Sequence, residues 1–377
     1  MPQPLPTKPA FRAEHVGSLL RPKELLDARY AEGSAAPSRD HIQKLEDLFI
    51  PAAIALQEKA GLQSISDGEF RRASFRSPIV ERIDGFKTVP QDPIWAARDE
   101  AGHSHPLGDA PLAIARLARN RNIATHEFDF ISARTDRTPK IALPAPSYHY
   151  FYHQPDPSAY ADADEYLDDL VRIYREEIAG LAARGATYIQ FDEVIQAYMC
   201  DKNIRANLAK RGDNYKKLSA LYVDLINRII HGQPAHMTFA VHFCRGNSMG
   251  RWVAEGGYGA IAEIVFGGLK ADALFMEYDT PRAGDFTPLR YVSDEKTVVL
   301  GLIGTKSGAL EDKDDIKRRI DEAAKFIPLD RLCLSPQCGF ASRDKGNPIT
   351  IDDQIAKLSL VVDVATDVWG GVLPSRI

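Results

Sequence analysis

Cysteine is scarce in this sequence. The chain of 377 residues has four cysteines, Cys200, Cys244, Cys333 and Cys338. Proteins held together by disulfides carry more cysteines at shorter, paired spacings, so a disulfide framework is excluded as the basis of this fold. Few and scattered cysteines fit a reducing compartment, where a thiol serves as a metal ligand or in catalysis. We therefore expect a cytoplasmic protein.

The sequence also lacks long apolar runs and an excess of charge of one sign. No stretch approaches the ~18 apolar residues of a membrane span, and the amino-terminal residues lack the apolar segment of a signal peptide. Lys and Arg number 47 against 52 for Asp and Glu, which gives a net charge of −5. This balance predicts neither a nucleic-acid partner nor a membrane surface. A homo-oligomer is compatible with the sequence.

A glycine-rich fingerprint is missing as well. No Gly-x-Gly-x-x-Gly opens a helix, which argues against an open, doubly wound sheet that binds a nicotinamide cofactor or S-adenosylmethionine. What is present instead is a regular alternation of strands and helices, and this alternation predicts a parallel sheet. Eight strands are predicted, at residues 14–20, 62–69, 139–144, 187–192, 236–247, 271–277, 297–302 and 331–335.

Eight strand-helix units predict a (β/α)8 barrel of the α/β class, with its active site at the carboxyl ends of the strands. A single barrel domain would account for residues 1–377. Residues 1–12 are predicted to be a flexible arm. Residues 70–137 are rich in proline and lack a clear period. We interpret them as an insertion near the barrel mouth, between strands two and three, with a hairpin and one helix near Ala110–Arg121.

The fifth strand carries two metal-ligand types on one face. Its period of two places bulky apolar residues on the outer face and Thr238, Ala240, His242 and Cys244 on the other. A His-x-Cys pair alone is more often part of a core than of a metal site. An imidazole and a thiol at the carboxyl end of a barrel strand nevertheless lie where a metal centre would form.

Other strands end in residues that would reach the same space. They contribute Asp67, Glu69, Asp192, Glu193 and Glu277, and Cys338 follows the last strand. His242, Cys244, Glu277 and Cys338 together would make a tetrahedral zinc site. Cys244 and Cys338 are 94 positions apart, unlike the short paired spacings of structural zinc sites, so catalysis is favoured. Zinc with thiolate ligands binds a further thiol in its deprotonated form, the nucleophile that accepts an alkyl group.

These motifs resemble those of the cobalamin-independent methionine synthase family. His242-x-Cys244, Glu277 in Phe-Met-Glu and Cys338 in Ser-Pro-Gln-Cys-Gly are similar to the family's zinc ligands. His15-Val16-Gly17-Ser18 resembles the opening strand motif, whose serine contacts the homocysteine carboxylate. Asp67-Gly68-Glu69-Phe70 and Gln190-Phe191-Asp192-Glu193 resemble the segments whose Glu and Asp bind the amino group. The resemblance covers almost the whole chain and implies a barrel methyltransferase of methionine biosynthesis that uses Zn²⁺, homocysteine and methyltetrahydrofolate.

The sequence departs from the family at the site expected for the methyl donor. Where the family has a histidine thought to act as an acid, this chain has Lys306, which would serve as the catalytic acid, as an anion contact or as a solvated surface group. The tryptophan that stacks on the donor is replaced by nearby tyrosines, and we assign Tyr148 to substrate binding. This chain resembles only the catalytic one of the family's two barrels, so the donor is either methyltetrahydrofolate or another carrier, such as a methylated corrinoid protein or a small sulfonium.

Three other functions compete with this interpretation. The first is zinc-dependent alkyl transfer to a different thiol, as in enzymes that open epoxides with a sulfonated thiol. Arg71, Arg72, Arg76 and Arg245 would then hold the sulfonate. The second is a metal-free lyase resembling uroporphyrinogen decarboxylase, and the third is a structural zinc barrel that binds a partner.

Overall fold

The carboxyl-terminal two thirds of the chain build a continuous parallel sheet. The computed structural model describes residues 8–33 and 36–373. Six strands pair in sequence order, from β7 to β12. Their bounds are β7 (Ile141–Pro144), β8 (Tyr188–Glu193), β9 (Thr238–Phe243), β10 (Ala273–Glu277), β11 (Thr297–Ile303) and β12 (Leu332–Pro336). The predicted strands three to eight are therefore confirmed.

The first two strands are much shorter than predicted, yet they close the barrel. β1 (Ser64–Ile65) pairs with β6 (Thr138–Pro139), which leads into β7. The segment before β1 forms only a parallel bridge from Ala13 to Leu334 of β12. Farther along, Leu19 N donates to the carbonyl of Gly68, 3.0 Å away. Eight parallel segments thus follow one another around a closed ring, and the predicted (β/α)8 barrel is the fold.

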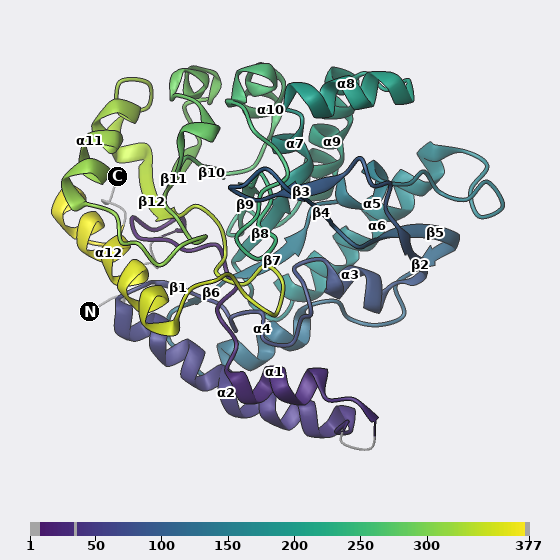
Figure 1. Cartoon of the computed structure of the whole chain (residues 1–377), viewed down its shortest axis with the longest axis horizontal. Helices are drawn as coiled ribbons and strands as arrows, with labels where there is room; N and C mark the ends of the chain where they lie inside the picture. Colours follow the sequence, from purple (N-terminus) through teal and green to yellow (C-terminus); the bar gives the residue numbers. More distant parts are fainter. Residues whose placement is uncertain (1–7, 34–35, 374–377) are drawn as a thin grey trace.

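Helices cover the outside of this ring (Figure 1). α2, α11 and α12 lie along one side of it, and α12 packs on both α2 and α11. Apolar side chains of the outer strand faces, such as Phe239, Val241 and Phe243, are buried between the strands and the surrounding helices. A separate cluster that includes Tyr188, Ala240 and Phe275 fills the barrel interior. The helices are α1 (Lys23–Tyr30), α2 (Arg39–Ala60), α3 (Ser77–Arg82), α4 (Thr125–Ser132), α5 (Tyr148–Phe151), α6 (Ala163–Ala182), α7 (Val194–Tyr198), α8 (Lys202–Arg211), α9 (Tyr215–Ile230), α10 (Ala262–Gly268), α11 (Lys313–Ala323) and α12 (Ile351–Trp369).

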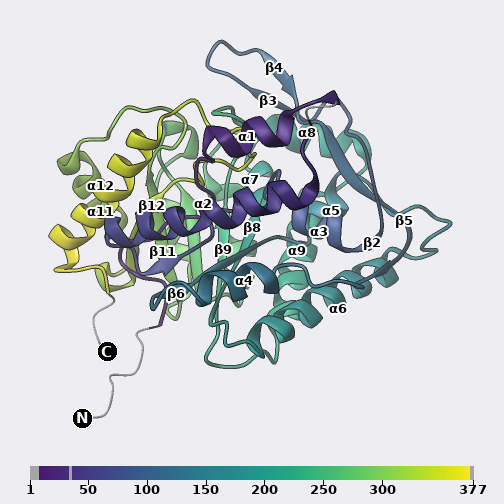
Figure 2. The same ribbon diagram turned by 90° about the horizontal axis from the view of Figure 1, so that it is seen from below.

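The insertion of residues 70–137 contains two hairpins. β2 (Asp84–Pro90) pairs with β5 (Asp109–Ala118), and β3 (Ala96–Arg98) pairs with β4 (Ser104–Pro106). The helix predicted near Ala110–Arg121 is wrong, because this stretch forms β5, and the helices of the region are α3 and α4. The β3–β4 hairpin projects at the top of the view in Figure 2. Its Arg98 forms an antiparallel bridge with Trp252, so the hairpin is tied to the loop that follows β9.

The amino-terminal segment is only partly described. Of the arm predicted for residues 1–12, residues 1–7 lie outside the described residues. Ala10, Phe11 and Arg12 are buried, and Arg12 donates to the carbonyls of Asp330 and Leu332 at 2.8 Å. The flexible arm therefore does not extend to these three residues. Each helix in the described part of the chain is too short or too polar to cross a membrane.

Candidate metal centre and substrate cavity

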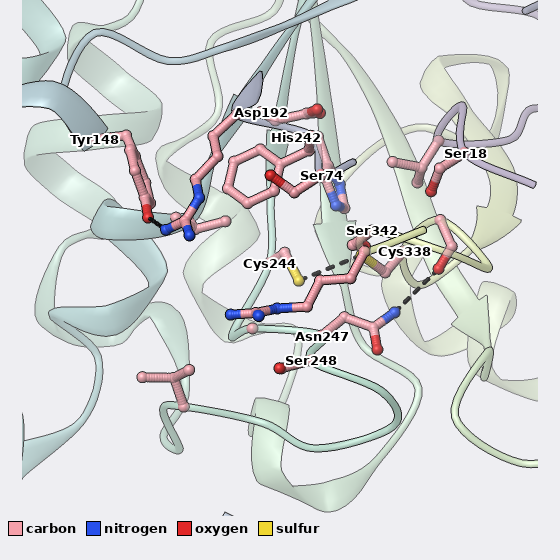
Figure 3. A pocket seen from close by; sticks show the side chains of 18 of the residues that line it. Ser18, Ser74, Tyr148, Asp192, His242, Cys244, Asn247, Ser248, Cys338 and Ser342 are labelled. Atoms are coloured by element: carbon pink, nitrogen blue, oxygen red, sulfur yellow. Dashed lines mark hydrogen bonds between the residues drawn. The ribbon is translucent and has the colours of Figure 1, made fainter. Parts of the chain in front are cut away.

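Three of the predicted metal ligands meet at the carboxyl ends of β9 and β12. His242 is near the end of β9, Cys244 follows that strand, and Cys338 follows β12. One ligand atom from each lies within 4.8 Å of the others, and all three side chains are buried. The Cys244 thiol donates to the Cys338 sulfur at 3.4 Å. Figure 3 shows the two sulfurs facing each other below His242.

The cluster has the chemistry of a zinc site. Both ring nitrogens of His242 are buried without a hydrogen-bond partner among the described residues, as expected of a side chain that awaits a ligand. The hydrogen bond from Cys244 and the imidazole of His242 lower the pKa of Cys338 well below its ordinary value, although burial opposes them. One imidazole and two thiols, one of them readily ionised, match the donor types that zinc prefers. The residues present therefore fit this metal.

Glu277, the predicted fourth ligand, lies beside the three-residue cluster and has other partners. The Arg245 backbone N–H donates to its carboxylate at 2.5 Å, and Lys306 Nζ is 3.3 Å from its Oε1. Lys306 also lies 4.0 Å from Asp279. Burial lowers the pKa of Lys306, but the two carboxylates outweigh burial and raise it. Lys306 is thus a largely buried, ion-paired cation and not a solvated surface group.

A cavity opens onto the two thiols, and most of the residues predicted to bind substrate line it. Its lining includes Ser18, Glu69, Tyr148 and Asp192 together with His242, Cys244 and Cys338. His15 and Lys306 are not among the residues that line it. His15 is buried, with its Nε2 3.0 Å from the Ser64 carbonyl oxygen, so any effect on substrate would pass through the strands around it.

Two buried carboxylates give this cavity the character of a cation site. Glu69 has φ of 58°, in the left-handed region, which directs its side chain inward after the turn at Gly68. Its Oε2 is buried without a hydrogen-bond partner in the described part of the chain. Gln190 donates to Asp192 at 2.8 Å. Burial raises the pKa of Glu69 and raises that of Asp192 to about 7. A bound ammonium group would favour their ionised forms.

Comparison with known proteins gives a second, independent line of evidence about this chain. The family model described as "Cobalamin-independent synthase, Catalytic domain" matches residues 12–367. The chain belongs to this family. It is thereby an enzyme of the methyltransferase type, as predicted, and the resemblance seen in its motifs is confirmed.

Three similar proteins illustrate how far the resemblance extends. The chain is 36% identical to the uncharacterized protein YxjH of Bacillus subtilis (strain 168), over 96% of both chains. It is 22% identical to methionine synthase of Pyrococcus abyssi, over 89% of this chain and 88% of that protein. The crystal structure of the putative vitamin-B12 independent methionine synthase from Listeria monocytogenes superposes with a TM-score of 0.74 at 30% identity, over 97% of this chain and 100% of that one.

Some of the residues predicted at strand ends stabilise the fold and do not line the cavity. Glu193 accepts hydrogen bonds from Ser147 at 2.7 Å and from the backbone N–H groups of Ile195 and Gln196, so it caps α7. Cys200 and Cys333 are buried core thiols outside the cluster.

Sequence reasoning missed other residues of the cavity. Its wall also contains Phe75, Tyr198, Asn247, Ser342 and Arg343. Asn247 belongs to the stretch that follows His242, but its role depends on the fold, since its Nδ2 donates to the Gly339 carbonyl at 3.0 Å. Only the position of Ser342 and Arg343 a few residues after Cys338 would have indicated their place in the site.

Proposed function

We propose that this protein is a zinc-dependent S-methyltransferase that converts homocysteine to methionine. The observation that carries the proposal is the opening of the His242, Cys244 and Cys338 cluster into a cavity that also holds Glu69 and Asp192. A metal for the sulfur and two carboxylates for the ammonium group match the two ends of a thiol amino acid. The methionine synthases among the relatives support this choice of substrate.

The zinc would be held by His242, Cys244 and Cys338, and Glu277 stays our proposed fourth ligand. Its carboxylate is close enough to Cys244 to raise the pKa of that thiol, after the larger contribution from Cys338. When bound, zinc supplies one property to the reaction: it favours the deprotonated form of a coordinated thiol near neutral pH. Burial of all three ligands keeps bulk water away from that position.

The chain's own residues would orient the homocysteine. Glu69 and Asp192 would accept hydrogen bonds from its ammonium group, and the Ser18 hydroxyl would donate to its carboxylate. Ser18 Oγ is 3.4 Å from the Ala341 backbone N–H, which fixes the hydroxyl against the loop after β12. We assign His15 to support of this strand, since it does not line the cavity. Fixing both ends of the amino acid holds the sulfur in line with an incoming methyl group.

The methyl transfer itself is a displacement at carbon. A new carbon–sulfur bond forms to the homocysteine sulfur, the bond from the methyl carbon to its carrier breaks, and its electron pair stays on the carrier. The proposed carrier is methyltetrahydrofolate or another methylated compound. Lys306 would act as a fixed cation beside Glu277 and not as the acid that protonates the leaving carrier, since its side chain does not line the cavity.

A second candidate, alkyl transfer to a sulfonated thiol, has one observation in its favour. Of the four arginines predicted for the sulfonate, Arg76 lines the cavity. The other three are engaged elsewhere, as Arg71 and Arg72 bind Glu46 and Glu127, and Arg245 binds the Gly256 carbonyl. The metal-free lyase is not supported, because the family match and the cluster both favour a metal-dependent methyltransferase.

Calorimetric titration of the zinc-loaded protein tests the proposal. In buffers of different ionisation enthalpy, homocysteine binding is expected to release about one proton per site more than methionine binding, because only homocysteine has a thiol that is deprotonated on binding. Any protons that the ammonium group displaces from Glu69 and Asp192 are released by both amino acids. Cys338→Ala without zinc is the control. Equal proton release by homocysteine and methionine would refute the proposal, and preferred binding of a sulfonated thiol would favour the second candidate.

A further inference from the structure

Two arginines of the cavity have no carboxylate partner. Within the described residues, neither Arg76 nor Arg343 has a carboxylate oxygen within 4.0 Å of its guanidinium group, although both line the cavity that contains the thiols. Arg76 donates to the Tyr148 hydroxyl, and Arg343 donates to the Leu107 carbonyl. Arg71, in the same loop as Arg76, contacts both Glu46 and Asp47. Arg71 therefore has counter-ions that the two arginines of the cavity lining lack.

The fold holds the two guanidinium groups near each other. Ser74 and Arg343 form an antiparallel bridge, and Phe75 N donates to the Ser342 carbonyl at 3.0 Å. The loops after β1 and β12 therefore run side by side at the cavity wall. Burial lowers the pKa of Arg343, and the nearby charge of Arg76 lowers it further. Two neighbouring cations that have no carboxylate within 4.0 Å repel each other, and a bound anion would relieve this repulsion.

The arginines lie apart from the residues that we assign to homocysteine. In Figure 3, Tyr148, the partner of Arg76, and Ser18 are on opposite sides of the two cysteines. Ser342 connects Arg343 to the metal cluster, since its hydroxyl is 3.5 Å from the Cys338 sulfur. Ser74, Arg76 and Arg343 also line a second cavity of about 480 Å³ next to the first. A substrate larger than homocysteine could therefore enter beside the thiols and pass between these arginines.

We propose that Arg76 and Arg343 form an anion subsite that binds an acidic group of the methyl donor, a carboxylate, sulfonate or phosphate. The assignment to the donor rests on the proposed function, in which Ser18, Glu69 and Asp192 already hold the amino acid. Guanidinium groups suit this task because they present several N–H donors to the oxygens of one anion. Phe75 and Tyr148 would pack beside the bound group, since their rings are 5.5 Å apart at the same wall.

Calorimetric titration of the zinc-loaded full chain with inorganic phosphate, methanesulfonate and acetate tests the subsite. Saturating homocysteine is present, so that the open position of the metal is filled. At least one of these anions is expected to bind at one site per chain. Arg76→Gln and Arg343→Gln are each expected to weaken its affinity tenfold or more, because each removes a charge-assisted contact. Arg71→Gln is the matched control from the same loop and is expected to leave the affinity unchanged.

Homocysteine affinity, measured in the same proteins, identifies which substrate carries the acidic group. Equal homocysteine affinity in the presence and absence of the anion, and in both arginine variants, supports a subsite for the donor. Competition between the anion and homocysteine overturns that assignment, and this comparison needs no variant. A protein that binds zinc and homocysteine but none of the anions overturns the subsite and leaves the proposed function standing. Failure to bind zinc or homocysteine overturns the proposed function and the assignment to the donor with it.

Discussion

The ion pair between Lys306 and Glu277 gives a prediction whose size follows from the structure. The two groups are 3.3 Å apart, with side chains 11% and 2% exposed. At an effective dielectric constant of about 20, two charges at this distance attract by about 5 kcal/mol. Glu277 keeps its hydrogen bond from the Arg245 backbone after loss of the lysine. We therefore expect Lys306→Leu to destabilise the metal-free protein by about 3 kcal/mol, at the lower end for a broken buried pair.

Urea unfolding of four proteins measures this interaction. These are the unmodified chain, Lys306→Leu, Glu277→Gln and the double variant, all without metal. The coupling free energy of the cycle is expected to be about 2 kcal/mol or more, because either single change removes the nearest counter-ion of the remaining charge. A coupling below about 0.5 kcal/mol, the scatter expected of independent sites, would refute the reasoning. Leucine is chosen because a methionine thioether could itself bind the metal.

Three other predictions concern the ligands, the substrate contact and pH. Cys338→Ser is expected to weaken zinc affinity at least a hundredfold in chelator competition, and unchanged affinity would remove the thiol from the site. Glu69→Gln is expected to weaken homocysteine affinity tenfold or more in calorimetry while zinc content stays the same, and equal affinity would contradict its role. Burial raises the pKa of Glu193 to about 7. Its protonated form therefore stabilises the fold at low pH, and this contribution is lost as pH rises from about 4.5 through 7. Glu193→Gln is expected to flatten that loss in urea unfolding, and an unchanged slope would contradict the assignment.

The strands could be predicted well where both faces are buried. β8 to β12 alternate between apolar side chains that face the helices and side chains that fill the barrel interior or reach the site, and this period of two marks them in the sequence. The sequence predicted longer strands for the first two barrel segments than the structure has. Hydrogen bonds from polar side chains hold these segments in place where a ladder of backbone hydrogen bonds was expected. Ser66 Oγ donates to the Gly17 carbonyl at 2.6 Å, and Gln57 bonds the backbone of Ser66 at 2.9 Å. Such contacts span distant positions and leave no local pattern.

The wrong helix near Ala110–Arg121 has a specific physical cause. The pairing of β2 with β5 shifts register between Asp84 and Phe86, so the alternation of faces is interrupted. Ala110, Ala113 and Leu117 are buried in β5, together with Pro111. Their spacing of three and four residues imitates one face of a helix. Only the partner strand, about 25 residues earlier in the chain, determines the true structure.

The metal site could be predicted in part because its ligands lie at the ends of strands or directly after them. His242 and Cys244 share a strand face, and the end of each barrel strand predicts where a side chain must point. The contacts of Glu277 with Lys306 and Arg245 could not be predicted in this way, since they join the end of β10 to the loops after β9 and β11. The pairing of Arg76 with Arg343 likewise depends on a bridge between loops that are distant in the sequence.

X-ray absorption at the zinc edge tests the central claim most directly. The claim is that His242, Cys244 and Cys338 hold a metal that receives the sulfur of the substrate. The purified chain is expected to hold one zinc with two sulfur ligands and at least one nitrogen ligand. Addition of homocysteine should raise the count to three sulfurs, and methionine should leave it at two. A zinc shell that does not change with homocysteine, or an active protein without zinc, would contradict the account.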